Sequence, residues 1–199
     1  MSKPRYHHGN LRAALVQAGL DILHEKGLAG LTLRACAARA GVSHAAPKNH
    51  FANLAALLAA IAAEGFRQHA ERMRAMMRVA KFDPQSQILA AFDGYLQFAQ
   101  KNPDLFRLMF STDRQGDLYP ELVEAADLFY DILRQISTRV ELDQGTGPAP
   151  RTTAEAMLWS FIHGYTSLVI NDQFGRAIQE TGSVPSLSEI IPRMQSSQQ

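Results

Sequence analysis

The sequence predicts an all-α protein of two modules, and three observations lead to this prediction. Hydrophobic residues make up 46% of the 199 residues and charged residues 20%, as in globular chains that bury a core. Apolar residues recur at helical spacing along most of the chain, and strand alternation is nearly absent. Residues 1–55 have a net charge of +5 and residues 56–199 a net charge of −4. We therefore expect a basic module at 1–55 and a larger helical module at 56–199.

Composition excludes several classes of protein. The single cysteine, Cys36, excludes a disulfide framework and a cysteine-based zinc site. The longest apolar run covers ten residues, 54–63, and is too short to cross a bilayer. The N-terminus lacks the apolar stretch of a signal peptide. We expect a soluble cytoplasmic protein that holds no metal and no cofactor and does not bind membranes.

Three helices are expected in the basic module, and a long helix follows them. Their predicted ranges are 10–26, 32–40, 44–51 and 53–80. Gly27 is expected to end the first helix. Thr32 is expected to cap the second helix, which Gly41 stops, and Ser43 to cap the third.

The larger module is predicted to be helical throughout. Apolar periodicity predicts four helices, at 85–101, 103–111, 118–143 and 152–173. Residues 144–150 form a loop by composition, and a Gly/Ser/Pro stretch at 182–186 precedes a last short helix.

The most informative stretch is 31–51, where two short helices are joined by residues 40–43. This arrangement predicts a helix-turn-helix, in which the turn needs a residue free to adopt positive φ, and Gly41 supplies it. The second helix of such a motif enters the major groove of DNA with its N-terminus first. An ordinary antiparallel helical hairpin stays open as an alternative.

Residues 8–66 resemble the N-terminal domain of the TetR/AcrR family of bacterial transcriptional repressors. Residues 6–12 (Tyr-His-His-Gly-Asn-Leu-Arg) and 42–47 (Val-Ser-His-Ala-Ala-Pro) are similar to one subgroup, whose C-terminal domain has a Trp…His-Gly signature. Trp159, His163 and Gly164 match that signature. The resemblance implies an all-helical homodimer, in which a three-helix DNA-binding domain joins a larger helical-bundle domain that binds a small effector and dimerises.

Two positions depart from the pattern of the family. Lys48 stands where the family usually has a tyrosine, and Leu54 stands where it usually has a lysine. Both usual residues contact backbone phosphate, so the departures concern the phosphate contacts rather than the fold. The point charge of Lys48 is expected to replace the tyrosine.

Position in the helix-turn-helix assigns roles in DNA binding. His44, Ala45 and Ala46 open the recognition helix and are expected to face base edges. The full set of candidate DNA-binding residues is Thr32, Ser43, His44, Ala45, Ala46, Lys48, Asn49, His50, Lys3 and Arg5. For the arm residues Lys3 and Arg5 a solvated tail is the open alternative, and for His50 a helix-end cap.

Residues 56–199 show no catalytic constellation, so we expect no enzyme. They are rich in methionine and aromatic residues, which line apolar pockets and also fill ordinary cores. Taken with the resemblance, this surplus predicts a pocket for a mainly apolar effector. The candidate lining residues are His69, Met73, Met76, Phe92, Tyr95, Phe106, Phe110, Phe129, Trp159 and His163.

A row of small residues, Ala156, Ser160, Gly164 and Ser167, follows helical spacing. The resemblance favours a dimer interface for this row, and packing within one subunit is the alternative. We expect a ligand-responsive dimeric regulator, most simply a repressor, that binds a palindromic double-stranded DNA operator. Two rivals stay open: a constitutive DNA-binding dimer, and a helical-bundle enzyme or cofactor binder.

Overall fold

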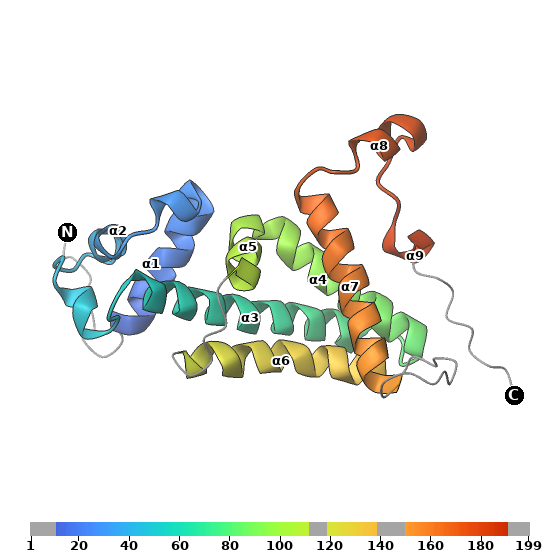
Figure 1. Cartoon of the computed structure of the whole chain (residues 1–199), viewed down its shortest axis with the longest axis horizontal. Coiled ribbons are helices and arrows are strands. Elements are labelled where there is room, and N and C mark those ends of the chain that lie inside the picture. Colours follow the sequence, from blue (N-terminus) through green and yellow to red (C-terminus); the bar gives the residue numbers. More distant parts are fainter. Residues whose placement is uncertain (1–10, 112–118, 139–149, 191–199) are drawn as a thin grey trace, which may run out of the picture. The chain divides into compact units, whose positions relative to one another are not determined.

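The computed structural model describes residues 11–111, 119–138 and 150–190 of the chain. Within these ranges the structure consists of α-helices and two short 3-10 helices, and no strand occurs among the described residues (Figure 1). The predicted all-α class is therefore confirmed.

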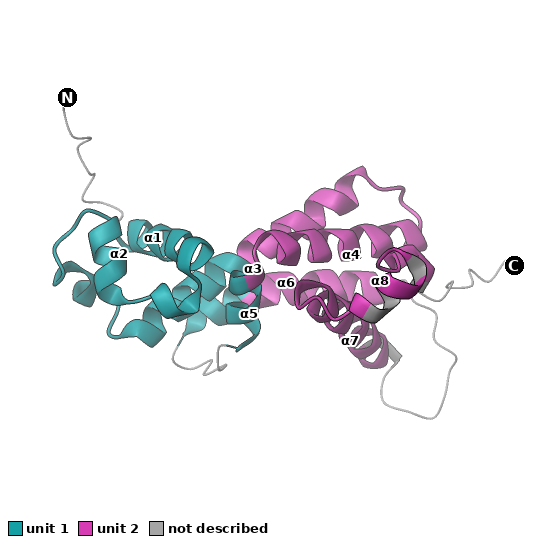
Figure 2. Ribbon diagram, turned by 90° about the horizontal axis from the view of Figure 1, so that it is seen from above, with its two compact units in different colours: residues 1–65, 104–125 teal, residues 66–103, 126–199 magenta. Residues whose placement is uncertain are grey.

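The chain divides into two compact units, coloured separately in Figure 2. Unit 1 comprises residues 1–65 and 104–125, and unit 2 comprises residues 66–103 and 126–199. The division falls within three helices. It cuts α3 (Leu54–Val79) and α6 (Pro120–Ser137), so each of them contributes residues to both units, and it separates Pro103, the first residue of α5 (Pro103–Ser111), from the rest of that helix. The functional boundary after residue 55 was drawn from charge and stays a prediction.

Unit 1 is built on a core of apolar side chains from its N-terminal helices. Its first elements are α1 (Leu11–Lys26), η1 (Leu28–Gly30), α2 (Leu33–Arg39) and η2 (Ala46–Asn49). Leu15 and Cys36 are fully buried where α1 packs on α2, and Phe51 is buried just before α3. Most of the short helix α5 (Pro103–Ser111) also belongs to this unit. The 3-10 turn η1 was not predicted.

The turn after α2 has the predicted geometry. The Thr32 hydroxyl accepts a hydrogen bond from the Ala35 N–H at 3.0 Å and so caps α2. Gly41 adopts a φ of 71°, which favours glycine. The Val42 N–H then donates to the Ala37 carbonyl at 3.0 Å and closes the turn.

The third predicted helix, 44–51 with Ser43 as its cap, is wrong in type and length. The segment is the 3-10 helix η2, and no side chain caps it. Pro47 has no N–H to bond back to Ser43, and the Ser43 carbonyl instead accepts from the Ala46 N–H at 3.0 Å. The His50 N–H bonds three residues back, to the Pro47 carbonyl. Hydrogen bonds between residues three positions apart wind the backbone more tightly than in an α-helix, so the segment is a 3-10 turn.

Unit 2 combines the second part of α3 and of α6 with four further helices. These are α4 (Pro84–Lys101), α7 (Pro150–Ile170), α8 (Gly175–Thr181) and α9 (Leu187–Ile190). Helix α4 packs against α7 and α9. A Cβ atom at Gly94 of α4 would lie 2.7 Å from the Met73 Cα atom, so glycine lets α4 approach α3 closely.

Several predicted ends differ from the observed ones. Helix α6 ends at Ser137, and the predicted continuation through residues 139–143 lies outside the described residues. Helix α7 ends at Ile170 rather than at 173, because the chain turns at Asp172, whose φ is 53°. Helix α8 was not predicted.

Candidate DNA-binding surface and aromatic cluster

The turn between α2 and η2 and the residues that follow it form the surface of the candidate helix-turn-helix. Most of the predicted DNA-binding side chains here are exposed: Ser43, His44, Ala45, Lys48, Asn49 and His50, together with Thr32. Ala46 is half-buried, whereas Pro47 and Phe51 are buried and anchor the segment. Lys3 and Arg5 lie outside the described residues.

The basic charge of this module is partly neutralised. The Arg39 guanidinium donates to the Glu25 carboxylate at 2.7 Å and lies 3.6 Å from the Asp21 carboxylate. The hydrogen bond from Arg39 lowers the pKa of Glu25. Among described residues 11–55, Lys26, Arg34 and Lys48 are exposed cations that form no ion pair, and Arg34 and Lys48 belong to the helix-turn-helix, where they are available to phosphate. Arg34 was not among the predicted DNA contacts, although its place in the first turn of α2 is visible in the sequence.

An aromatic cluster forms the centre of unit 2, and His69 is part of it. The His69 ring stacks on Phe98 with centroids 4.5 Å apart and meets the Tyr95 ring at 4.4 Å. Phe129 lies 5.1 Å away. Burial lowers the pKa of His69 to about 3, so the imidazole is neutral at pH 7. This packing is that of a core aromatic residue, and an effector contact of His69 stays a prediction.

A polar pair links the cluster to α7. The Tyr95 hydroxyl lies 2.8 Å from Nδ1 of His163. Burial lowers the pKa of His163 and raises the pKa of Tyr95 well above its usual value, although the neighbouring Trp159 indole opposes the rise at Tyr95. Both groups are therefore neutral at pH 7, and the hydroxyl can donate to Nδ1.

Two further polar groups lie on the same face of α7. The Trp159 indole nitrogen and the Thr166 hydroxyl are buried and meet no partner at hydrogen-bonding geometry among the described residues. Trp159, His163 and Thr166 follow the i, i+4, i+7 spacing of one helical face. Thr166 was not predicted as a site residue, because a lone threonine in an apolar helix carries no signal in sequence.

The structure brings together some of the predicted effector residues but not all of them. Met73, Phe92 and Phe129 are buried in unit 2 with His69 and Tyr95, and Met76 of α3 is half-buried. Phe106 and Phe110 lie in unit 1, where their rings pair at 4.9 Å. Their contact with an effector in unit 2 stays a prediction.

Three members of the predicted small-residue row, Ala156, Ser160 and Gly164, are exposed on α7, and Ser167 is half-buried. A Cβ atom at Gly164 would meet nothing within 4 Å in the described part of the chain. Two large apolar side chains of the same helix are also exposed, Met157 by 55% and Leu168 by 44%. This face of α7 is therefore not packed against the described residues of the chain, whereas the opposite face is buried.

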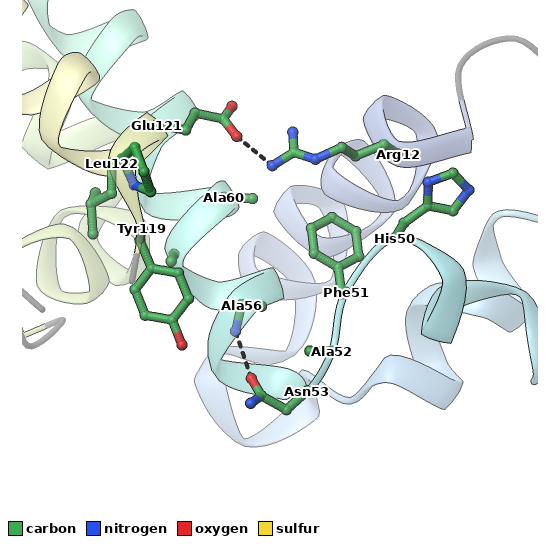
Figure 3. Close-up of a pocket in the computed structure, with 12 residues that line it drawn as sticks. Arg12, His50, Phe51, Ala52, Asn53, Ala56, Ala60, Tyr119, Glu121 and Leu122 are labelled. Atoms are coloured by element: carbon green, nitrogen blue, oxygen red, sulfur yellow. Dashed lines mark hydrogen bonds and ion pairs between the residues drawn. The ribbon is translucent and has the colours of Figure 1, made fainter. Parts of the chain in front are cut away.

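Sequence reasoning missed a cavity of about 590 Å³ in unit 1 (Figure 3). Its lining comes from the start of α1, the end of the helix-turn-helix, the start of α3 and the start of α6. The side chains of Arg12 and Glu121, 109 residues apart in sequence, form an ion pair at its edge. No local sequence pattern could join segments so far apart.

The described residues show neither a metal cluster nor a membrane span. No group of three or more His, Cys, Asp or Glu side chains among them could hold a metal ion. No helix in 11–111, 119–138 or 150–190 is long and apolar enough to cross a bilayer.

Two protein-family models match the sequence. Residues 15–61 match the model described as bacterial regulatory proteins of the tetR family. Residues 88–186 match a tetracyclin repressor-like C-terminal domain. A comparison with curated proteins finds no match.

Solved structures share the fold along most of the chain. A protein of unknown function from Rhodococcus sp. RHA1 is 28% identical, with a TM-score of 0.71, and the match covers 92% of this chain and 91% of that one. The regulator FadR of Bacillus subtilis, in complex with stearoyl-CoA, is 18% identical, with a TM-score of 0.61 and coverage of 86% and 99%. The TetR family regulator PfmR of Thermus thermophilus is 16% identical, with a TM-score of 0.54 and coverage of 77% and 83%.

Proposed function

Because the chain belongs to the TetR family and is therefore a DNA-binding transcriptional regulator, we propose that it is a repressor controlled by a small effector. Two copies form a homodimer on a palindromic operator in the bacterial cytoplasm, and a mainly apolar effector releases the DNA. The observation that carries the proposal is the exposed helix-turn-helix surface, where the exposed His44 and Lys48 lie within the regulatory-protein match at 15–61.

DNA binding is assigned by the chemistry of the exposed side chains. His44, Ala45 and Ala46 read base edges at the start of the recognition segment. Lys48 and Arg34 bind phosphates, and their exposure, without ion-pair partners among the described residues, supports this role. Ser43, Asn49 and His50 add polar contacts, with Lys3 and Arg5 reaching an adjacent groove. The Thr32 side-chain oxygen already caps α2, so its hydroxyl proton is what it offers to a phosphate.

Dimerisation is assigned to the exposed face of α7. Ala156, Ser160 and Gly164 would let a partner helix approach closely, and the exposed Met157 and Leu168 would be covered by it. Large apolar side chains left in solvent on one helix are a feature of protein interfaces. A dimer places two recognition segments about one helical turn of DNA apart, roughly 34 Å, which suits successive major grooves.

Effector binding is assigned to the aromatic cluster and the polar face of α7. The buried Trp159 indole N–H and Thr166 hydroxyl meet no partner at hydrogen-bonding geometry among the described residues, so they supply donors for an effector. A buried polar group is costly unless such a partner satisfies it. The aromatic surroundings favour a mainly apolar molecule. FadR shares the fold and binds stearoyl-CoA, which carries a long apolar chain, so this fold can accept such a ligand.

The proposed coupling runs through α3, which carries residues of both units. His69 lies in its second part, within the aromatic cluster, and Asn53 caps its start just after the helix-turn-helix. An effector that packs against the cluster shifts α3 and changes the spacing of the recognition segments. The energy available for release is the difference in effector affinity between the DNA-binding and released states.

A two-stage experiment tests effector control. Apolar and aromatic compounds are screened by thermal shift, because a ligand of the folded state raises the melting temperature. Each hit is then titrated into the complex with operator DNA. We expect release of DNA, with effector and operator weakening each other's binding by the same factor.

Matched variants then locate the effector. Trp159→Phe keeps a large ring but removes the indole N–H, so it is expected to weaken the effector while leaving DNA affinity unchanged. Tyr165→Phe is the control, since the Tyr165 hydroxyl is already bound to the Pro185 carbonyl at 2.8 Å. DNA binding that no compound alters would favour the constitutive dimer. Turnover of a substrate without DNA binding at low salt would favour the enzyme.

A further inference from the structure

The cavity of unit 1 is separate from the proposed effector site in unit 2. Its volume of about 590 Å³ falls in the range of small-molecule sites, about 300–1,000 Å³. Figure 3 shows Ala56 and Ala60 of α3 between the Tyr119 ring on one side and the Phe51 ring on the other. Because alanine side chains end at Cβ, this face of α3 leaves room for a flat molecule.

The floor of the cavity is held in place by a helix cap. The Asn53 side-chain oxygen accepts a hydrogen bond from the Ala56 N–H at 2.9 Å, which fixes the first turn of α3 (Figure 3). Phe51 is 2% exposed and forms a fixed wall, with the Arg12 guanidinium 5.3 Å from its ring centroid. The apolar part of the site is thus preformed.

An exposed ion pair lies at the edge of the cavity, and the carboxylate of a ligand can replace its acidic member. Arg12 binds the Glu121 carboxylate, and their side chains are 45% and 35% exposed. A pair this exposed contributes little stability, so replacing one carboxylate by another at Arg12 costs little. The guanidinium has five donors in a planar fork that matches a carboxylate.

We propose that this cavity binds a planar aromatic carboxylate. Its ring lies on the alanine face of α3 between Phe51 and Tyr119, and its carboxylate takes the place of Glu121 at Arg12. The ligand charge is then paired, which burial of an anion requires. The inference does not depend on the effector site of unit 2.

Isothermal titration calorimetry of 2-naphthoate into the full chain tests the inference. We expect saturable binding, and much weaker binding of the neutral isostere 2-naphthalenemethanol. Ala56→Leu places a larger side chain on the alanine face where the ring would lie, and should weaken naphthoate by about tenfold or more. Ala55→Leu places the same side chain at an exposed position of the same helix turn, outside the cavity lining, and should leave binding unchanged.

Two charge variants test where the ligand lies, because they should change naphthoate affinity in opposite directions. Glu121→Gln removes the competing carboxylate and should tighten naphthoate, whereas Arg12→Gln removes the cation and should weaken it. Neither variant should change the binding of the neutral isostere. If the ion pair is only structural, both variants weaken naphthoate together, and the inference is overturned even if Ala56→Leu fails to fold.

Two further results would also overturn it. One is no naphthoate binding at all to the unmodified chain. The other is naphthoate binding that Ala56→Leu leaves intact and Tyr95→Phe abolishes, because that result places the probe in unit 2. Failure here leaves effector control through unit 2 untouched, since its test uses operator release and the Trp159 variant.

Discussion

The Tyr95 hydroxyl of α4 lies 2.8 Å from Nδ1 of His163 on α7, so one hydrogen bond joins the two helices that pack together in unit 2. Tyr95 is fully buried, and its ring also contacts His69 and Phe129 at 4.4 and 5.7 Å. The same residue thus belongs to the apolar cluster and to the polar face of α7.

Tyr95→Phe should lower the free energy of unfolding by about 0.5–1.5 kcal/mol, because it removes a hydrogen bond but keeps the ring. Urea unfolding of the variant and of the unmodified protein measures this difference. The variant should also bind any effector found by screening less tightly. A stability equal to that of the unmodified protein would show that the bond contributes nothing.

The acid stability of the protein should depend on His69. Its pKa is about 3 in the folded state and about 6.5 in an unfolded chain, so between these values the unfolded state binds more protons. The contribution of neutral His69 to the free energy of unfolding is therefore fully present above pH 6.5. It falls as the pH drops toward 3, by up to about 1.4 kcal/mol per pH unit.

The comparison with His69→Leu isolates this contribution, since carboxylates titrate in both proteins. Urea midpoints at several values between pH 4 and 7 should fall less steeply in the variant. Parallel pH dependence in the two proteins would contradict the burial of a neutral imidazole at this position.

Two substitutions in the recognition segment should have different effects on DNA binding, one on overall affinity and the other on sequence preference. Lys48→Ala should weaken binding to all DNA sequences alike and reduce the salt slope by about 1. His44→Ala should relax the preference at one or two positions, with a loss of about 1–3 kcal/mol in discrimination. Binding to an operator library measures both, and a change of preference caused only by Lys48→Ala would reverse the assignment.

Gly164→Leu should prevent dimerisation without unfolding the chain. A Cβ atom at this position would meet nothing within 4 Å among the described residues. At a helix interface, however, a leucine would overpack the contact, at a cost of about 1–3 kcal/mol. Sedimentation should show a monomer with an unchanged helical circular dichroism signal. Ala13→Leu, at an exposed position of α1, is the control. A Gly164→Leu protein that stays dimeric would place the interface elsewhere.

The sequence sufficed for those parts of the fold that depend on local chemistry. The Thr32 cap and the positive φ of Gly41 follow from residue types a few positions apart, and both were predicted correctly. The type of η2 was not predicted correctly, because over so few residues helical periodicity does not distinguish an α-helix from a 3-10 turn. Pro47 was the available signal, since a proline at this point removes the bond to Ser43.

The sequence predicted which types of residue form the candidate sites, but not which of them lie in contact. His69 and Tyr95 were grouped by composition, and the structure shows them in contact. Phe106 was grouped with them and lies in the other unit, since periodicity shows that a residue faces a core but not which core. The Arg12–Glu121 pair was not predicted, because it depends on tertiary contact alone.

The most direct test of the central claim is the binding of the full chain to DNA from upstream of its own gene, measured against scrambled competitor at increasing salt. The account predicts specific binding with two chains per palindromic site. It also predicts that log affinity falls linearly with log salt, by about 0.9 for each phosphate contacted. No binding at low salt, or an affinity that salt does not change, would contradict it.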